Sequence, residues 1–127
     1  MLIEVNTTEA PAAAGPYSQA VRAGDFVFVS GQLPIDPASG KIVDGFEAQT
    51  EQAIANLRAV LEAAGGGLDS VVRAGVFLTN MEHFARVNQI YAQHFTSTVK
   101  PARAAYQVGR LPLGAEVEIE ATAHIPA

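Results

Sequence analysis

The sequence predicts an α/β sandwich in which two helices cover one face of a sheet. Two stretches carry apolar residues at helical spacing, and they are set among five runs typical of strands, in the order strand-strand-helix-strand-helix-strand-strand. At 127 residues the chain has the size of one domain. We therefore expect residues 1–127 to form a single domain whose second sheet face is covered by something other than a helix.

The first part of the chain predicts two strands followed by a long loop. Residues 17–23 and 26–30 are apolar runs joined by Gly24-Asp25, a two-residue signal for a hairpin turn. Residues 26–30 are apolar on both faces, which favours a central place in the sheet. Residues 31–45 contain several turn-forming residues and little periodicity, and loops of this length are often functional.

The next segment predicts the first helix. Its apolar stripe runs from Phe46 to Ala64 at the i, i+4, i+7, i+8 spacing of a helix with one buried face. Asp44, with Glu47 three residues later, resembles a capping box at the start. The three glycines at 65–67 are expected to end the helix.

The second half of the chain predicts a strand, a helix and two further strands. Residues 71–79 are rich in β-branched and aromatic groups, and Thr79 with Glu82 predicts the start of a helix reaching about residue 96. Lys100-Pro101 closes that segment. Residues 103–109 and 115–125 are then expected to pair as an antiparallel hairpin through the turn RLPLG.

Composition excludes several classes of protein. With no cysteine, the chain has no thiol nucleophile, thiolate metal site or disulfide. A net charge of −5 and the scattered basic residues argue against nucleic-acid binding. No apolar run is long enough to span a membrane, and the N-terminus lacks the pattern of a signal peptide, so we expect a cytoplasmic protein. Charged residues are only 17% of the chain, which suggests that self-association hides part of the surface.

The last strand and its expected neighbour carry the most noticeable polar residues. Glu116, Glu118 and Glu120 alternate with apolar residues, so they form either a solvated sheet face or a source of one catalytic carboxylate. If 103–109 pairs with this strand, Arg103 lies near the acidic row. It would then be either one half of an ordinary ion pair or the planar cation of an anion site.

Three other polar residues are open to two interpretations. Asn88 interrupts the apolar stripe of the second helix, as either a buried hydrogen-bonding residue or a group facing a site. Ser30 ends an apolar run before Gly31, where it satisfies a turn or faces a pocket. Tyr17 suits either the core or a site. No nucleophile elbow, phosphate loop or zinc-binding histidine pair is present, so these residues do not name a reaction.

Five segments together resemble the YjgF/RidA family, in order from about Asn6 to Ala123. They are AGPYSQAV (14–21), VSGQLPIDPASG (29–40), QTEQAIANLRAVLEAAG (49–65), VFLTNMEHFARVNQIY (76–91) and PARAAYQVGRLPLGAEVEIEA (101–121). The resemblance implies a fold like that of the small chorismate mutases, with a mixed, mostly antiparallel sheet and two helices on one face. It also implies a homotrimer with sites between subunits and no cofactor or metal.

The implied activity is that of a 2-iminobutanoate/2-iminopropanoate deaminase, a hydrolase acting on enamines and imines such as 2-aminoacrylate. The residues that match the family's site are Tyr17, Ser30, Gly31, Asn88, Arg103, Ala105 and Glu118. The resemblance implies that Arg103 binds the substrate carboxylate, Ser30 and Gly31 orient it, and Glu118 with the Ala105 carbonyl positions the attacking water. Tyr17 would pack on the substrate.

This sequence departs from the family's pattern at Ala105, where cysteine is common, so no thiol chemistry is possible there. Two alternatives stay open: a trimer that binds small keto acids without turnover, and an endoribonuclease, an activity ascribed to some relatives. The side chain of the preferred imine and the pyridoxal-phosphate enzyme upstream are not determined by the sequence.

Overall fold

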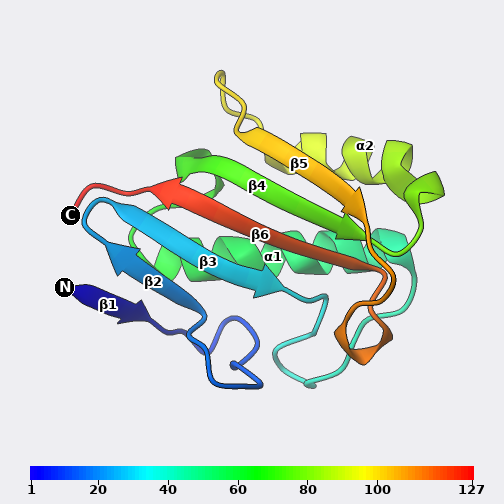
Figure 1. The fold of residues 1–127 in the computed structure, drawn as a ribbon, viewed down its shortest axis with the longest axis horizontal. Coiled ribbons are helices and arrows are strands. Elements are labelled where there is room, and N and C mark those ends of the chain that lie inside the picture. Colours follow the sequence, from blue (N-terminus) through cyan, green and yellow to red (C-terminus); the bar gives the residue numbers. More distant parts are fainter.

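A computed structural model describes all residues from 1 to 127. It contains one six-stranded sheet with the strand order β1-β2-β3-β6-β4-β5 (Figure 1). All neighbouring strands are antiparallel except β4 and β5, which confirms the predicted mixed, mostly antiparallel sheet. The strands are β1 (Leu2–Val5), β2 (Ala20–Ala23), β3 (Phe26–Gln32), β4 (Val71–Leu78), β5 (Ala102–Gln107) and β6 (Val117–His124).

Two helices, α1 (Phe46–Ala63) and α2 (Phe84–His94), lie on the same face of the sheet, as predicted (Figure 1). The apolar stripe of α1 packs against β3 and β6, and the side chains of Ile54, Leu57 and Leu61 are completely buried. Every second residue of β6 completes this core, beginning with Val117 and Ile119. No helix or strand covers the opposite face, which is called the open face below.

The ends of several elements differ from the sequence prediction. β1 was not predicted, and the second strand begins at Ala20 rather than at residue 17. The predicted helix caps are wrong: α1 begins after Gly45 without a side-chain cap, and a short 3₁₀ turn at 81–83 precedes α2. The side chain of Asn80, rather than Thr79, accepts a hydrogen bond from the Glu82 N–H at 3.0 Å. An asparagine suits this position because its short side chain reaches the free N–H groups at a helix start.

The predicted hairpin between the last two strands is also wrong. β5 pairs with β4 in parallel, and β6 returns between β3 and β4. The connection contains a 3₁₀ turn at Pro112–Gly114 in which Leu113 and Gly114 have positive φ, and it carries the chain past the end of β4. The physical reason is burial: alternate residues of β6 are almost fully buried, whereas no residue of β5 is. The more apolar strand therefore takes the central place.

No helix of the chain is both long and apolar enough to cross a lipid bilayer.

Candidate active site

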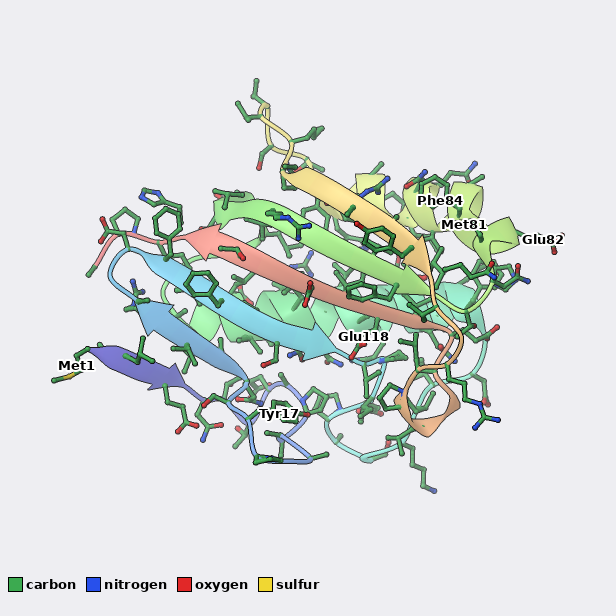
Figure 2. All side chains as sticks on the ribbon, in the orientation of Figure 1. Met1, Tyr17, Met81, Glu82, Phe84 and Glu118 are labelled. Atoms are coloured by element: carbon green, nitrogen blue, oxygen red, sulfur yellow. The ribbon has the colours of Figure 1, made fainter.

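A cavity of about 530 Å³ opens where β3 and β6 meet the loops on either side. Its polar wall contains four of the predicted site residues: Tyr17, Ser30, Gly31 and Glu118. Figure 2 shows Tyr17 and Glu118 at the same end of the sheet. The apolar part of the wall comes from three loops and consists of Pro11, Ala12, Ala14, Leu33, Ile35, Pro112 and Leu113. The cavity is therefore an apolar space with one carboxyl group in its wall.

Glu118 projects from β6 onto the open face and lies over Gly31 of the neighbouring strand. A Cβ atom on Gly31 would lie 2.7 Å from Oε2 of Glu118 and 2.9 Å from its Cδ. The absent side chain at position 31 is thus what leaves room for the carboxyl group. Burial raises the pKa of Glu118 above its ordinary value, and the charge of Glu120 on the same strand raises it further.

Glu120 also lies over a glycine, on the other side of β6. Its side chain lies over Gly75 of β4, where an added Cβ would approach Cγ of Glu120 to 3.0 Å. Glu116, by contrast, precedes the strand, and its backbone N–H donates to Oε1 of Gln49 at 2.7 Å. The predicted row of three carboxylates is therefore a pair on the open face, Glu118 and Glu120.

Tyr17 and Ser30 both line the cavity, and their role in a site stays a prediction. The Tyr17 ring packs against Gly15, and its hydroxyl accepts a hydrogen bond from the Ala14 N–H at 3.2 Å. Half of the side chain stays exposed beside the cavity, so it is not a core residue. The Ser30 hydroxyl donates to the Ser18 carbonyl at 2.6 Å, which fixes the oxygen atom in the cavity wall with its lone pairs free to accept.

Buried amide side chains that the sequence analysis missed hold the cavity walls. Gln19 donates to the carbonyls of Thr7 and Pro11 at 3.0 and 2.8 Å. Asn56, on α1, donates to the carbonyls of Leu33 and Ile35 at 2.9 Å each. The signal was available for Asn56, because it is a polar residue beside the apolar stripe of the predicted helix. These bonds tie the loops to α1 and to the residue before β2 and satisfy loop carbonyls, although the Leu33 carbonyl also accepts from the Ile35 N–H at 2.8 Å.

The other three predicted residues gather on the opposite face, between β5 and α2. The Arg103 guanidinium lies over the rings of Phe84 and Tyr91, with its carbon atom 5.5 and 4.8 Å from the two ring centroids. Ala105, two residues further along β5, packs against the core. The Oδ1 atom of Asn88 is buried on α2 and has no hydrogen-bond partner. The Asn88 oxygen thus lacks the hydrogen bond that a buried structural role would supply, and the interpretation that Asn88 faces a site stays a prediction.

The expectation that Arg103 lies near the acidic row is wrong for a single chain. Arg103 is paired with Ala74, whose side chain is buried on the helical side, whereas Glu118 is paired with Phe77 on the open face. β4 also separates the two strands, so they are two strand spacings, about 10 Å, apart. The seven predicted residues thus fall into two groups on opposite faces of one sheet, which we call candidate half-sites. The Glu118 half-site also contains Tyr17, Ser30 and Gly31, and the Arg103 half-site also contains Asn88 and Ala105.

Charge pairing sets Arg103 apart from other cations near α2. Arg86 forms an ion pair with Glu47 at 2.6 Å, and His94 contacts the Glu51 carboxylate at 3.1 Å; neither contact involves a predicted site residue. No carboxylate lies within ion-pair distance of Arg103. No three His, Asp or Glu side chains lie close enough together to form a metal-binding cluster. The two half-sites therefore offer a proton-accepting carboxyl group and an unpaired planar cation.

The fold is that of a small α+β domain with a mixed six-stranded sheet, and comparisons with known proteins identify the family of the chain. The sequence model described as Endoribonuclease L-PSP matches residues 7–125. The chain belongs to this family, the YjgF/RidA/RutC family, which confirms the resemblance seen in the sequence. A 2-iminobutanoate/2-iminopropanoate deaminase from Bos taurus is 50% identical over 120 residues, which cover 94% of this chain and 87% of the bovine protein.

Solved structures share the fold over almost the whole chain. RidA from the Antarctic bacterium Psychrobacter sp. PAMC 21119 is 46% identical with a TM-score of 0.94, over 97% of this chain and 99% of that one. TdcF of E. coli, solved with bound serine, is 37% identical with a TM-score of 0.92, over 96% and 98% of the two chains. Identities of this size support a Rid-type function for the chain.

Proposed function

We propose that this chain catalyses the hydrolytic deamination of small enamines and imines that carry a carboxylate, such as 2-aminoacrylate and 2-iminopropionate. The products are a 2-keto acid and ammonia. The observation that carries the proposal is Glu118, a partly buried carboxyl group with a raised pKa in the wall of the 530 Å³ cavity. The name of the bovine relative supports the same reaction.

The chemistry begins with tautomerisation, in which a proton moves from the enamine nitrogen to the terminal carbon and gives the imine. Water then attacks the imine carbon: a C–O bond forms, and Glu118 takes a proton from the water and passes it to the nitrogen, which gives the carbinolamine. Glu118 then takes the hydroxyl proton and passes it to the amino group, so the C–N bond breaks as the C=O bond forms, ammonia leaves, and Glu118 is again a carboxylate. A carboxyl group that takes and returns protons in this way contributes typically 10²–10⁴-fold to the rate.

The raised pKa of Glu118 suits this role. A general base is most effective when its pKa lies close to the working pH, because the carboxylate is then a stronger proton acceptor and is still ionised. Burial supplies most of the rise, and Glu120 adds to it. Ser30 and Tyr17 lie in the same cavity and would orient the substrate and limit the access of bulk water.

Arg103 is the residue that we propose binds the substrate carboxylate, supplied by a second copy of the chain. In 2-aminoacrylate the carboxylate is bonded directly to the reacting carbon, so its partner must lie beside Glu118. Within one chain the sheet separates Arg103 from Glu118. A homotrimer would bring the Arg103 half-site of one copy, with Asn88 and Ala105, against the Glu118 half-site of the next. The bound serine of TdcF, which also carries a carboxylate, is consistent with such a site.

The open face supports association of this kind. Phe26 and Phe28 of β3 and Tyr106 of β5 are 44%, 50% and 57% exposed, respectively. Aromatic residues in such numbers on one face are typical of an interface between protein chains. The low proportion of charged residues, 17%, agrees with a surface that is partly hidden from water.

Mixing two inactive variants tests both parts of the proposal. Arg103→Ala and Glu118→Gln should each lose at least 100-fold in ammonia release from 2-aminoacrylate generated in situ, while each keeps the wild-type oligomeric state. The two variants are unfolded together in equal amounts and refolded. Each site takes Arg103 from one copy and Glu118 from its neighbour, and each copy supplies the intact residue with a chance of one half, so about a quarter of the sites will contain both intact residues. Recovery of about a quarter of wild-type activity is expected. If the mixture stays inactive, the shared site is refuted.

A second candidate function is binding of small keto acids without turnover, which the unpaired charge of Arg103 favours. The two candidates differ at Glu118, because binding a carboxylate requires Arg103 but no proton acceptor. Release of ammonia above the spontaneous rate, lost in Glu118→Gln, supports hydrolysis. Tight binding of pyruvate with no acceleration of ammonia release would instead support the binding protein.

A further inference from the structure

The α2 helix carries a row of side chains that contact Arg103 or lie beside it. Phe84, Asn88, Tyr91 and Phe95 are spaced by four, three and four residues, so they lie along one face of the helix, from its first residue to the residue just after its last. The rings of Phe84 and Tyr91 lie under the Arg103 guanidinium. Phe95 stacks on Tyr91 with 4.1 Å between ring centroids and 15° between ring planes. We call Phe84, Tyr91 and Phe95 the aromatic seat.

Tyr91 and Phe95, the inner part of the aromatic seat, are tightly packed. Tyr91 is 8% exposed and Phe95 3% exposed, and both belong to the hydrophobic core. The Tyr91 hydroxyl is buried without a hydrogen-bond partner. Burial raises the pKa of this hydroxyl, and the nearby Arg103 charge opposes that rise only in part. The ring under Arg103 is therefore a neutral phenol, and the charge of the arginine is not cancelled by a phenolate.

The contact with the ring faces leaves the N–H groups of the Arg103 guanidinium free. A cation over an aromatic ring is held by the face of the ring, and a guanidinium can stack flat while its N–H groups point outward in its own plane. An ion pair with a carboxylate would occupy those N–H groups, and Arg103 has no such pair. The aromatic seat thus holds the side chain without using the hydrogen bonds that a carboxylate ligand needs.

We propose that Tyr91 is a positioning residue for Arg103, whose ring holds the guanidinium ready to receive the carboxylate of a small 2-keto or 2-imino acid. Ordering a long side chain on binding costs roughly 0.5–1.5 kcal/mol, which corresponds to about 2- to 13-fold in affinity. Because the ring of Tyr91 already orders the Arg103 side chain, this cost does not have to be met when the ligand binds. The identity of the anion rests on the proposed function, whereas the contact between Tyr91 and Arg103 does not.

The test compares two substitutions of one residue. Tyr91→Phe keeps the ring and removes only an unpartnered hydroxyl, so affinity for pyruvate and the free energy of unfolding should not fall. Tyr91→Leu keeps an apolar side chain but removes the ring. We expect it to weaken pyruvate binding, measured by calorimetry, by about 2- to 13-fold. The KM for the imine should rise by a similar factor, with little change in kcat, because the reacting groups on the Glu118 side are untouched.

Two further variants keep the test decisive. Ile90→Val shortens a buried, non-aromatic side chain of the same helix, and it should leave pyruvate affinity unchanged. Phe84→Leu removes the less buried ring of the seat and should weaken binding in the same direction, even if Tyr91→Leu fails to fold. The proposal is overturned if Tyr91→Leu binds pyruvate like the wild type, if Tyr91→Phe loses as much as Tyr91→Leu, or if Ile90→Val does. A wild-type protein that neither binds pyruvate nor releases ammonia refutes the proposed function itself.

Discussion

Replacing Gly31 with alanine tests whether the space beside Glu118 is needed for activity. The new Cβ would lie 2.7 Å from Oε2 and 2.9 Å from Cδ of Glu118, closer than such atoms approach in proteins. Ordinary contact requires the oxygen to retreat by about 0.7 Å. A misplacement of about 1 Å at a reacting group costs on the order of 100-fold, so we expect kcat to fall by about 10- to 100-fold. The fold should change little, because the displaced atoms are the end of a flexible side chain.

The assay is ammonia release from 2-aminoacrylate, with Gly109→Ala as the matched control. No heavy atom lies within 4 Å of a Cβ at position 109, and the backbone there does not have positive φ. The control should keep wild-type activity, and both variants should unfold within about 1 kcal/mol of the wild type. Wild-type kcat in Gly31→Ala would refute the claim that the position of the Glu118 carboxylate limits the reaction.

Four further substitutions test other contacts of the site and of the open face. Burial and Glu120 raise the pKa of Glu118, so the enzyme should lose activity at a higher pH than an ordinary glutamate would predict as the pH falls. Glu120→Gln removes the smaller cause. The midpoint of its pH–rate profile should therefore move to lower pH without reaching the midpoint of a free glutamate. The folded state then binds more protons than the unfolded state between the two pKa values of Glu118, so its ionisation destabilises the fold as pH rises, and Glu118→Gln should raise Tm at neutral pH. Asn56→Ala leaves the Ile35 carbonyl without its partner and removes one of the two hydrogen bonds to the Leu33 carbonyl, so it should lower the free energy of unfolding, measured in urea, by about 1–3 kcal/mol. Phe28→Asp puts a charge on the open face, so light scattering should show a smaller assembly while far-UV circular dichroism stays unchanged; an unaltered mass would argue against association through this face.

The elements that the sequence predicted well are those with a strong local pattern. The stripe from Phe46 to Ala64 predicted α1 almost to the residue, because an amphipathic helix of that length has one periodicity and one buried face. The alternation in β6 correctly placed Glu118 opposite the buried face. β1, at Leu2–Val5, was missed because a short, mostly exposed strand has little pattern to recognise.

The candidate site was predicted residue by residue but not in its arrangement. The family resemblance supplied seven positions, and the structure places four of them in the cavity wall and the other three between β5 and α2. The residues that position the cavity loops and Arg103, such as Asn56 and Tyr91, were not recognised. A buried amide or tyrosine looks the same in a sequence whether it serves packing or a site. Their roles depend on what lies beside them in the folded chain.

By itself the sequence determined the number and type of most elements and the face of each strand on which a residue lies. Alternation within a strand is a local property, so Arg103 and Tyr106, three residues apart, lie on opposite faces of β5. Only the tertiary structure decided which strands are neighbours, since backbone N–H and C=O groups pair equally well with any strand. The burial of β6 between β3 and β4 moved β5 to the edge and put Arg103 on the helical face, away from Glu118.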